Sequence, residues 1–196
     1  AETYIAGRMA LILSSYPDLG QAYDRQIDAL QEQLGITYES RQRRAITMAL
    51  NNGVFILTGG PGTGKTTIIN AIIELFEQRG DKVMLAAPTG RAAKRMSELT
   101  GRQSKTIHRL LEVDFRDGAG TVFKRDERNT LPADVIVVDE MSMVDTLLFQ
   151  SLLRAMKLGC RLVMVGDTDQ LPSVGPGNVL KDLIEADVIP TVHLQE

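Results

Sequence analysis

A glycine-rich run that ends in lysine and threonine, Gly59 to Thr66, has the residue types and spacing of a phosphate-binding loop. It matches the pattern G-x-x-x-x-G-K-[ST] at every fixed position, between an apolar run and an amphipathic helical pattern. Glycines let successive backbone N–H groups turn onto one phosphate, and a following helix directs its N-terminal dipole at the same anion. The run therefore predicts a site for ATP.

The side chains of this run have separate expected tasks. Lys65 would place a catalytic cation near the β- and γ-phosphates, and Thr66 would offer its hydroxyl to Mg²⁺. The expected nucleotide contacts of the run come from Gly60, Pro61, Gly62, Thr63, Gly64, Lys65, Thr66 and Thr67.

Two acidic residues, Asp139 and Glu140, follow the apolar run from Val135 to Val138. Carboxylates at the end of a buried strand lie at the sheet edge where α/β proteins bind ligands. We expect Asp139 to hold Mg²⁺ and Glu140 to polarise the attacking water, although the pair could instead cap the next helix. A second acid beside the metal ligand favours hydrolysis over phosphoryl transfer to a small molecule.

A third polar element runs from Gly166 to Pro172, after another apolar run. The Gln170 amide could reach the γ-phosphate and report its presence, so Gln170 is a further candidate catalytic residue. A hydrogen-bonded loop with no catalytic part is an equal alternative from the residues alone.

These candidate residues need a sheet to position them, and four apolar runs predict one. None of the runs alternates apolar with polar residues, which is typical of strands buried on both faces of a parallel sheet. Helical patterns, clearest from Thr66 to Arg79, separate most of them, so we expect an α/β fold of the RecA-like phosphate-loop ATPase type. A charged, glycine-containing excursion at 115–132 indicates a hairpin around Gly118 to Gly120. The four runs are Val54–Thr58, Val83–Ala87, Val135–Asp139 and Leu162–Gly166.

The first 34 residues have a helical pattern that breaks at Pro17 and Gly20. We expect this short helical segment to end a preceding domain, and residues 35–196 to form the ATPase domain. No apolar stretch approaches the roughly 20 residues of a membrane span, and no signal peptide is visible. Cys160, which has no second cysteine to pair with, favours a buried thiol and a reducing compartment such as the cytoplasm.

Taken in order, these motifs resemble those of superfamily 1 helicases, specifically the RecD-like branch that includes the exodeoxyribonuclease V alpha-subunit. Gln42 begins a run similar to the Q motif, whose glutamine reads the adenine edge. The matching runs, from motif I through Ia, Ib and II to motif III, are Leu57–Thr67, Ala87–Met96, Thr106–Leu111, Val137–Asp145 and Val165–Gly177.

The resemblance implies the first RecA-like motor domain of a DNA helicase, which couples ATP hydrolysis to 5′-3′ movement on single-stranded DNA. It also implies work in DNA repair or recombination, with other subunits as possible partners. Arginines of a second motor domain, expected after Glu196, would complete the site, so the chain alone would hydrolyse ATP poorly. One departure is that Glu39 and Arg41 stand where the branch usually has a small hydroxyl residue and an acid.

Six basic residues stand against one acid between Pro88 and Arg109, although the whole chain has a net charge of -3. Since motifs Ia and Ib lie in this segment, we interpret it as a stripe for a DNA backbone rather than a solvated helix face. It contains no aromatic cluster, so base stacking is not evident here and sequence specificity is not expected. The candidate DNA contacts are Pro88, Thr89, Gly90, Arg91, Thr106 and His108.

Rival functions stay open on the residues alone. One is a nucleotide-gated module that grips DNA without moving, and another is the helicase domain of a conjugative relaxase. A different phosphate-loop enzyme, such as a AAA-type remodeller or a kinase, is disfavoured by the element from Gly166 to Gly177 and by the run around Gln42.

Overall fold

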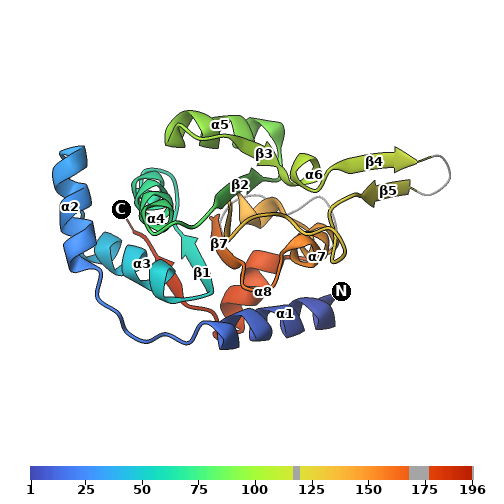
Figure 1. Ribbon diagram of the computed structural model, residues 1–196, viewed down its shortest axis with the longest axis horizontal. Helices are drawn as coiled ribbons and strands as arrows, with labels where there is room; N and C mark the ends of the chain where they lie inside the picture. Colours follow the sequence, from blue (N-terminus) through green and yellow to red (C-terminus); the bar gives the residue numbers. More distant parts are fainter. Residues whose placement is uncertain (117–119, 168–176, 196) are drawn as a thin grey trace.

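The predicted apolar runs lie side by side in one parallel sheet (Figure 1). The computed structural model describes residues 1–116, 120–167 and 177–195. All neighbouring strands of the sheet are parallel, so the expected mostly parallel α/β fold is confirmed. In sheet order, the strands are β3 (Ser104–Thr106), β2 (Val83–Ala87), β6 (Val135–Val138), β7 (Arg161–Gly166), β1 (Val54–Thr58) and β8 (Thr191–His193).

Helices cover both faces of this sheet. On one face lie α1 (Glu2–Ser15), α6 (Ile107–Leu110), α7 (Thr146–Ala155) and α8 (Val179–Glu185). On the other lie α2 (Asp24–Leu34), α3 (Ser40–Asn51), α4 (Lys65–Gln78) and α5 (Gly90–Thr100). The strands contribute to the hydrophobic core on both faces of the sheet because their side chains alternate. In β1, Val54 and Ile56 pack on the face covered by α1 and α7, whereas Phe55 and Leu57 pack on the face covered by α3 and α4.

The N-terminal helices lie on opposite faces of the sheet. Met9 of α1 belongs to the core with α7 and α8, and Ile27 of α2 to the core with α3 and α4. The chain between these helices, which contains Pro17 and Gly20, passes from one face to the other (Figure 1). Both helices therefore pack into the α/β unit, while the assignment of residues 1–34 to a preceding domain stays a prediction.

A two-stranded hairpin projects from the end of the sheet (Figure 1). Its strands, β4 (Val113–Arg116) and β5 (Gly120–Phe123), pair antiparallel, as expected for the charged excursion. The residues 117–119 that connect them lie outside the described part of the chain.

Cys160 is buried with 1% of its surface exposed, as predicted, and burial raises the pKa of its thiol to about 12. Across the described residues, each helix is too short or too polar to cross a membrane.

Candidate functional site

The glycine-rich run forms a tight loop between the end of β1 and the start of α4. Gly62 and Gly64 have φ angles of 76° and 85°, in the left-handed region that favours glycine. The Thr63 hydroxyl donates a hydrogen bond to the carbonyl oxygen of Gly60, at 2.7 Å. The loop thus leads directly into the N-terminus of a 14-residue helix, as an anion site of this type requires.

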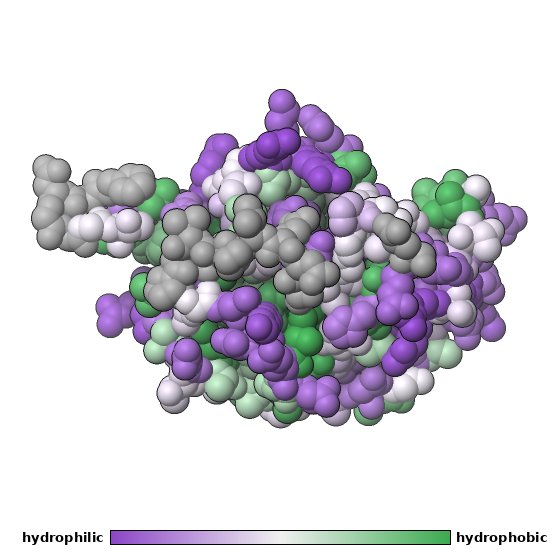
Figure 2. Space-filling model, turned by 180° about the vertical axis from the view of Figure 1, so that it is seen from behind, coloured by the Kyte–Doolittle hydropathy of each residue, from purple (hydrophilic) through white to green (hydrophobic). Residues whose placement is uncertain are grey.

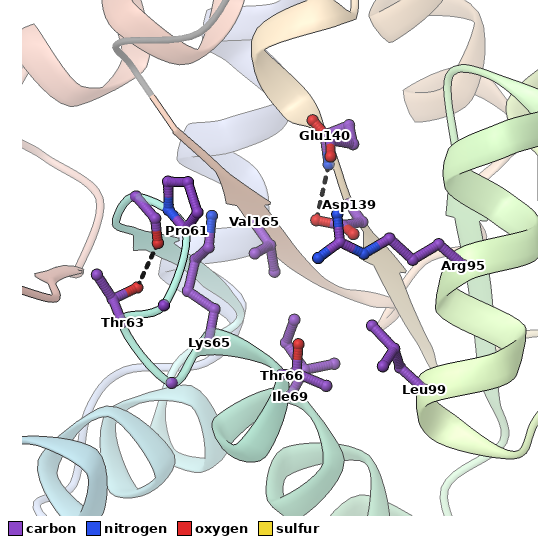
Figure 3. Close-up of a pocket in the computed structure, with 13 residues that line it drawn as sticks. Pro61, Thr63, Lys65, Thr66, Ile69, Arg95, Leu99, Asp139, Glu140 and Val165 are labelled. Atoms are coloured by element: carbon purple, nitrogen blue, oxygen red, sulfur yellow. Dashed lines mark hydrogen bonds between the residues drawn. The ribbon is translucent and has the colours of Figure 1, made fainter.

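This loop forms one wall of a pocket of about 240 Å³, and two acids form part of the opposite wall (Figure 3). Lys65 and Thr66 therefore share one cavity with Asp139 and Glu140, which lie more than 70 residues further along the sequence. The pocket is lined by residues 60–66 together with Ile69, Arg95, Leu99, Asp139, Glu140 and Val165.

The acidic pair follows β6, and a short 3-10 helix, η1 (Met141–Met143), comes after it. The backbone N–H of Glu140 donates to Asp139 Oδ1 at 2.8 Å. Glu140 has a φ of 54°, which is uncommon for a residue with a side chain and is found at functional sites more than elsewhere.

Burial dominates the electrostatics of both carboxyls. It raises the pKa of Asp139, against the opposing effects of the Glu140 N–H and the cations of Lys65 and Arg95. Burial also raises the pKa of Glu140, and the negative charge of Asp139 raises that pKa further. A cation in the pocket would favour the charged forms of both acids.

A third carboxylate, Asp167, was not among the expected site residues. It directly follows β7, is buried, and its Oδ2 would lie 3.7 Å from a Cβ placed on Gly60 of the loop. Its charge raises the pKa of Glu140. The signal that pointed to Asp139, an acid at the end of an apolar run, also applied to Asp167. Gln170, the residue expected from this element, lies outside the described residues.

Gln42 lies against the phosphate loop from the first turn of α3. Its Nε2 would be 2.9 Å from a Cβ on Gly64, and its Oε1 accepts the backbone N–H of Glu39 at 3.0 Å. Glu39, which departs from the branch pattern, forms a capping box with Gln42 at the start of α3. Gln42 and Thr67 are not part of the pocket lining.

The other departure from the branch pattern, Arg41, also has a structural partner. Its Nη1 donates to the carbonyl oxygen of His193 at 2.7 Å. This bond joins the start of α3 to the end of β8, which lies next to β1 and its loop.

The candidate DNA residues lie at the ends of two neighbouring strands. Ala87 of β2 pairs with Thr106 of β3, so Pro88 to Arg91 and Thr106 meet at the same sheet edge. Thr89 and Thr106 each cap a helix, because their hydroxyl oxygens accept a backbone N–H. The His108 ring instead lies 5.8 Å from the Phe123 ring of β5, which ties it to the hairpin.

The basic segment does not form a single stripe. Arg95 lines the nucleotide-sized pocket, and Arg102 forms ion pairs with Glu74 and Glu77 of α4 at 2.7 Å each. The expectation of one continuous stripe is therefore wrong for these two arginines, because Arg95 is directed into the pocket and Arg102 is held by α4.

Comparison with known proteins agrees with this geometry. The family model described as "AAA domain" matches residues 42–176, well over half of the chain. The chain belongs to this AAA domain family. Because the description names a broad phosphate-loop class, it does not by itself separate a helicase from the remodellers that the sequence motifs disfavoured.

Two named relatives of this chain favour a helicase over a remodeller. The "RecBCD enzyme subunit RecD" of Mycobacterium tuberculosis is 42% identical over 167 residues, which cover 74% of this chain and 28% of that protein. The "ATP-dependent RecD2 DNA helicase" of Deinococcus radiodurans is 38% identical over 196 residues, which cover the whole chain and 26% of that protein. The resemblance to RecD-like helicases is therefore confirmed, and the chain spans about a quarter of the length of these relatives.

Solved structures support the same assignment. Pif1 helicase from Candida albicans is 28% identical, with a TM-score of 0.59 over 82% of this chain and 40% of that one. The RecA-like type of fold is thus the one found in superfamily 1 helicases.

Proposed function

We propose that this chain is the first motor domain of an ATP-dependent DNA helicase. The observation that carries the proposal is the pocket in which the phosphate loop faces Asp139 and Glu140. A lysine, a helix N-terminus and carboxylates around one small cavity are the groups that bind and hydrolyse ATP with a divalent metal. The relatives named RecD and RecD2 helicase add support from outside the geometry.

The donors in the pocket fit a magnesium ion. The Thr66 hydroxyl and the Asp139 carboxylate are hard oxygen ligands in the same cavity, and Mg²⁺ is usually held by one or two carboxylates together with substrate phosphates. When bound, the ion would neutralise charge on the β- and γ-phosphates.

We propose the remaining roles from the sequence motifs and, for the described residues, from the pocket that they line or adjoin. Lys65 binds the terminal phosphates, and Glu140 polarises the attacking water from the opposite wall of the pocket. Gln170 senses the γ-phosphate. Gln42, whose amide nitrogen lies against the loop, reads the adenine edge.

For DNA, we propose the sheet edge formed by the ends of β2 and β3. Backbone groups of Pro88, Thr89 and Gly90 and the side chain of Arg91 contact the phosphate backbone there. Thr106 and His108 contribute from the neighbouring strand and α6. The pairing of Ala87 with Thr106 supports this grouping.

The activity of the whole protein is a wider proposal, since the chain spans about a quarter of its named relatives. We propose 5′-3′ movement on single-stranded DNA, in cytoplasmic DNA repair or recombination, with other subunits as partners. We also propose that residues 1–34 end a preceding domain and that a second motor domain supplies the arginines that complete the site.

The deciding experiment is ATP turnover by the complete protein, with and without single-stranded DNA, over a salt series. We expect DNA to stimulate turnover strongly, and the stimulation to fade as salt rises because phosphate contacts release counterions. Tight DNA binding without stimulated turnover would support the nucleotide-gated binding module. Turnover that is indifferent to DNA would leave the ATP site but exclude a DNA-coupled motor.

A further inference from the structure

Arg95 enters the ATP pocket from a helix that carries proposed DNA contacts. Its side chain extends from α5 toward Asp139, while Lys65 enters from the phosphate loop (Figure 3). The Arg95 cation acts electrostatically on both Asp139 and Glu140. The pocket thus has two cations on different elements, with the acidic pair between the loop and α5.

The guanidinium of Arg95 is available for a ligand. Within the described ranges, the side chain of Arg95 makes no hydrogen bond and no ion pair. Arg102, beyond the end of the same helix, is by contrast held by Glu74 and Glu77. A free guanidinium fork at the rim of a phosphate-binding pocket suits a phosphate oxygen, for which its planar set of donors is well matched.

Helix α5 connects this arginine to both sites. Arg91 and Arg95 are four residues apart, so they lie on the same face of the helix, about 6 Å apart along its axis. Ala93 and Met96 are the buried residues of α5, and hydrophilic residues gather over its outer side (Figure 2). The C-terminal end of α5 is hydrogen-bonded to α4, the helix that starts at Lys65. Asn70 Nδ2 of α4 donates to the Leu99 carbonyl oxygen of α5 at 3.3 Å.

We propose that Arg95 binds the terminal phosphate of the nucleotide and that DNA at the N-terminal end of α5 strengthens this contact. A helical turn is stiff, so DNA that shifts Arg91 also shifts Arg95 relative to the pocket. Arg95 is then the residue through which DNA binding raises the affinity for ATP. This inference rests on the proposed helicase function and assigns the coupling between its two sites to one side chain.

The test measures binding rather than turnover alone. A fluorescent, non-hydrolysable ATP analogue is titrated into the complete protein with and without an oligo-dT strand. The variants are Arg95→Gln and Arg95→Lys, with Arg25→Gln as the matched control because Arg25 is an exposed arginine of α2 that lies outside the basic segment and does not line the pocket. Melting temperatures verify that every variant folds.

We expect DNA to raise the analogue affinity of the unmodified protein by about 5- to 150-fold, the usual range for two coupled sites. Arg95→Gln should abolish this gain, Arg25→Gln should keep it, and Arg95→Lys should restore part of it because lysine keeps the charge without the fork.

Two results would overturn the assignment of Arg95 and leave the helicase proposal standing. One is an undiminished gain in Arg95→Gln, and the other is an equal loss in Arg25→Gln, which would make the gain a matter of net charge. Absence of any gain in the unmodified protein also overturns it. DNA-stimulated turnover of that same protein then decides whether the proposed function fails as well.

Discussion

Lys65 serves the ligand of the phosphate loop and contributes little to the core. Its half-buried side chain lines the ATP pocket. A hydrogen bond to a charged group contributes about 1.5–3 kcal/mol, so we expect Lys65→Ala to weaken nucleotide binding by about 10- to 150-fold. Titration with a fluorescent ATP analogue measures this loss, and the melting temperature should stay unchanged.

The matched control for Lys65 is Lys181→Ala, which removes an exposed lysine of α8 far along the chain from the loop. It should bind the analogue normally. If Lys65→Ala also binds normally, the loop is not the phosphate site.

Glu140 makes a different prediction, because its expected role is in the chemical step. In the complete protein, Glu140→Gln should keep ATP affinity and lower DNA-stimulated turnover by about 10²- to 10⁴-fold, the usual contribution of a general base. Parallel steady-state turnover and analogue titration separate the two effects. Glu185→Gln, a change at the end of α8, should alter neither, and equal turnover in Glu140→Gln would remove this residue from the catalytic role.

At the scale of single residues, the sequence predicted those contacts that a local pattern encodes. The loop glycines, Lys65 and the acidic pair stand in fixed spacings directly after apolar runs. Arg95 was missed as a pocket residue because only the packing of α5 against β2 and β3 decides which face of that helix meets the acids. Asp167 has the same local signal as Asp139, an acid directly after an apolar run. The residue predicted from this element was instead Gln170, because its amide could reach a phosphate.

At the scale of elements, α5 depends on its N-cap residue, Thr89. The Thr89 hydroxyl oxygen accepts the Ala92 N–H at 3.1 Å and so caps the helix. Thr89→Ala should lower the free energy of unfolding by about 1 kcal/mol, measured by urea denaturation. Thr89→Ser keeps an oxygen at the cap and should cost little. Equal losses in both variants would mean that the methyl group of Thr89, rather than the cap, stabilises this end of α5.

The long strands were predictable and the short ones were not. β1, β6 and β7 are central and almost wholly buried on both faces, and β2 is buried over its last three residues, so the sequences of all four are apolar runs. β3 and β8 are edge strands of three residues each, with partly exposed side chains. Their structure comes from pairing with β2 and β1, a tertiary contact that leaves little periodicity in three residues.

At the scale of the whole molecule, the N-terminal helices are part of both hydrophobic layers. Arg161 at the start of β7 strengthens this link, because its guanidinium stacks 3.9 Å from the Tyr16 ring centroid. It also donates to the carbonyl oxygens of Leu50 and Asn52, at 3.3 and 3.0 Å. Through Arg161, the segment that follows α1 contacts the end of the sheet where the strands begin. This end lies opposite the ATP pocket.

This packing gives a test of how far residues 1–34 form a separate unit. Met9 is 3% exposed in the core shared with α7, whereas Leu11 of the same helix is 45% exposed. If α1 folds together with the sheet, Met9→Ala should lower the free energy of unfolding by about 2–5 kcal/mol, and Leu11→Ala should change it by less than about 0.5 kcal/mol. Urea denaturation followed at several probes measures both. A small loss for Met9→Ala, or a separate early transition for the N-terminal segment, would instead show that α1 adds little to the ATPase unit.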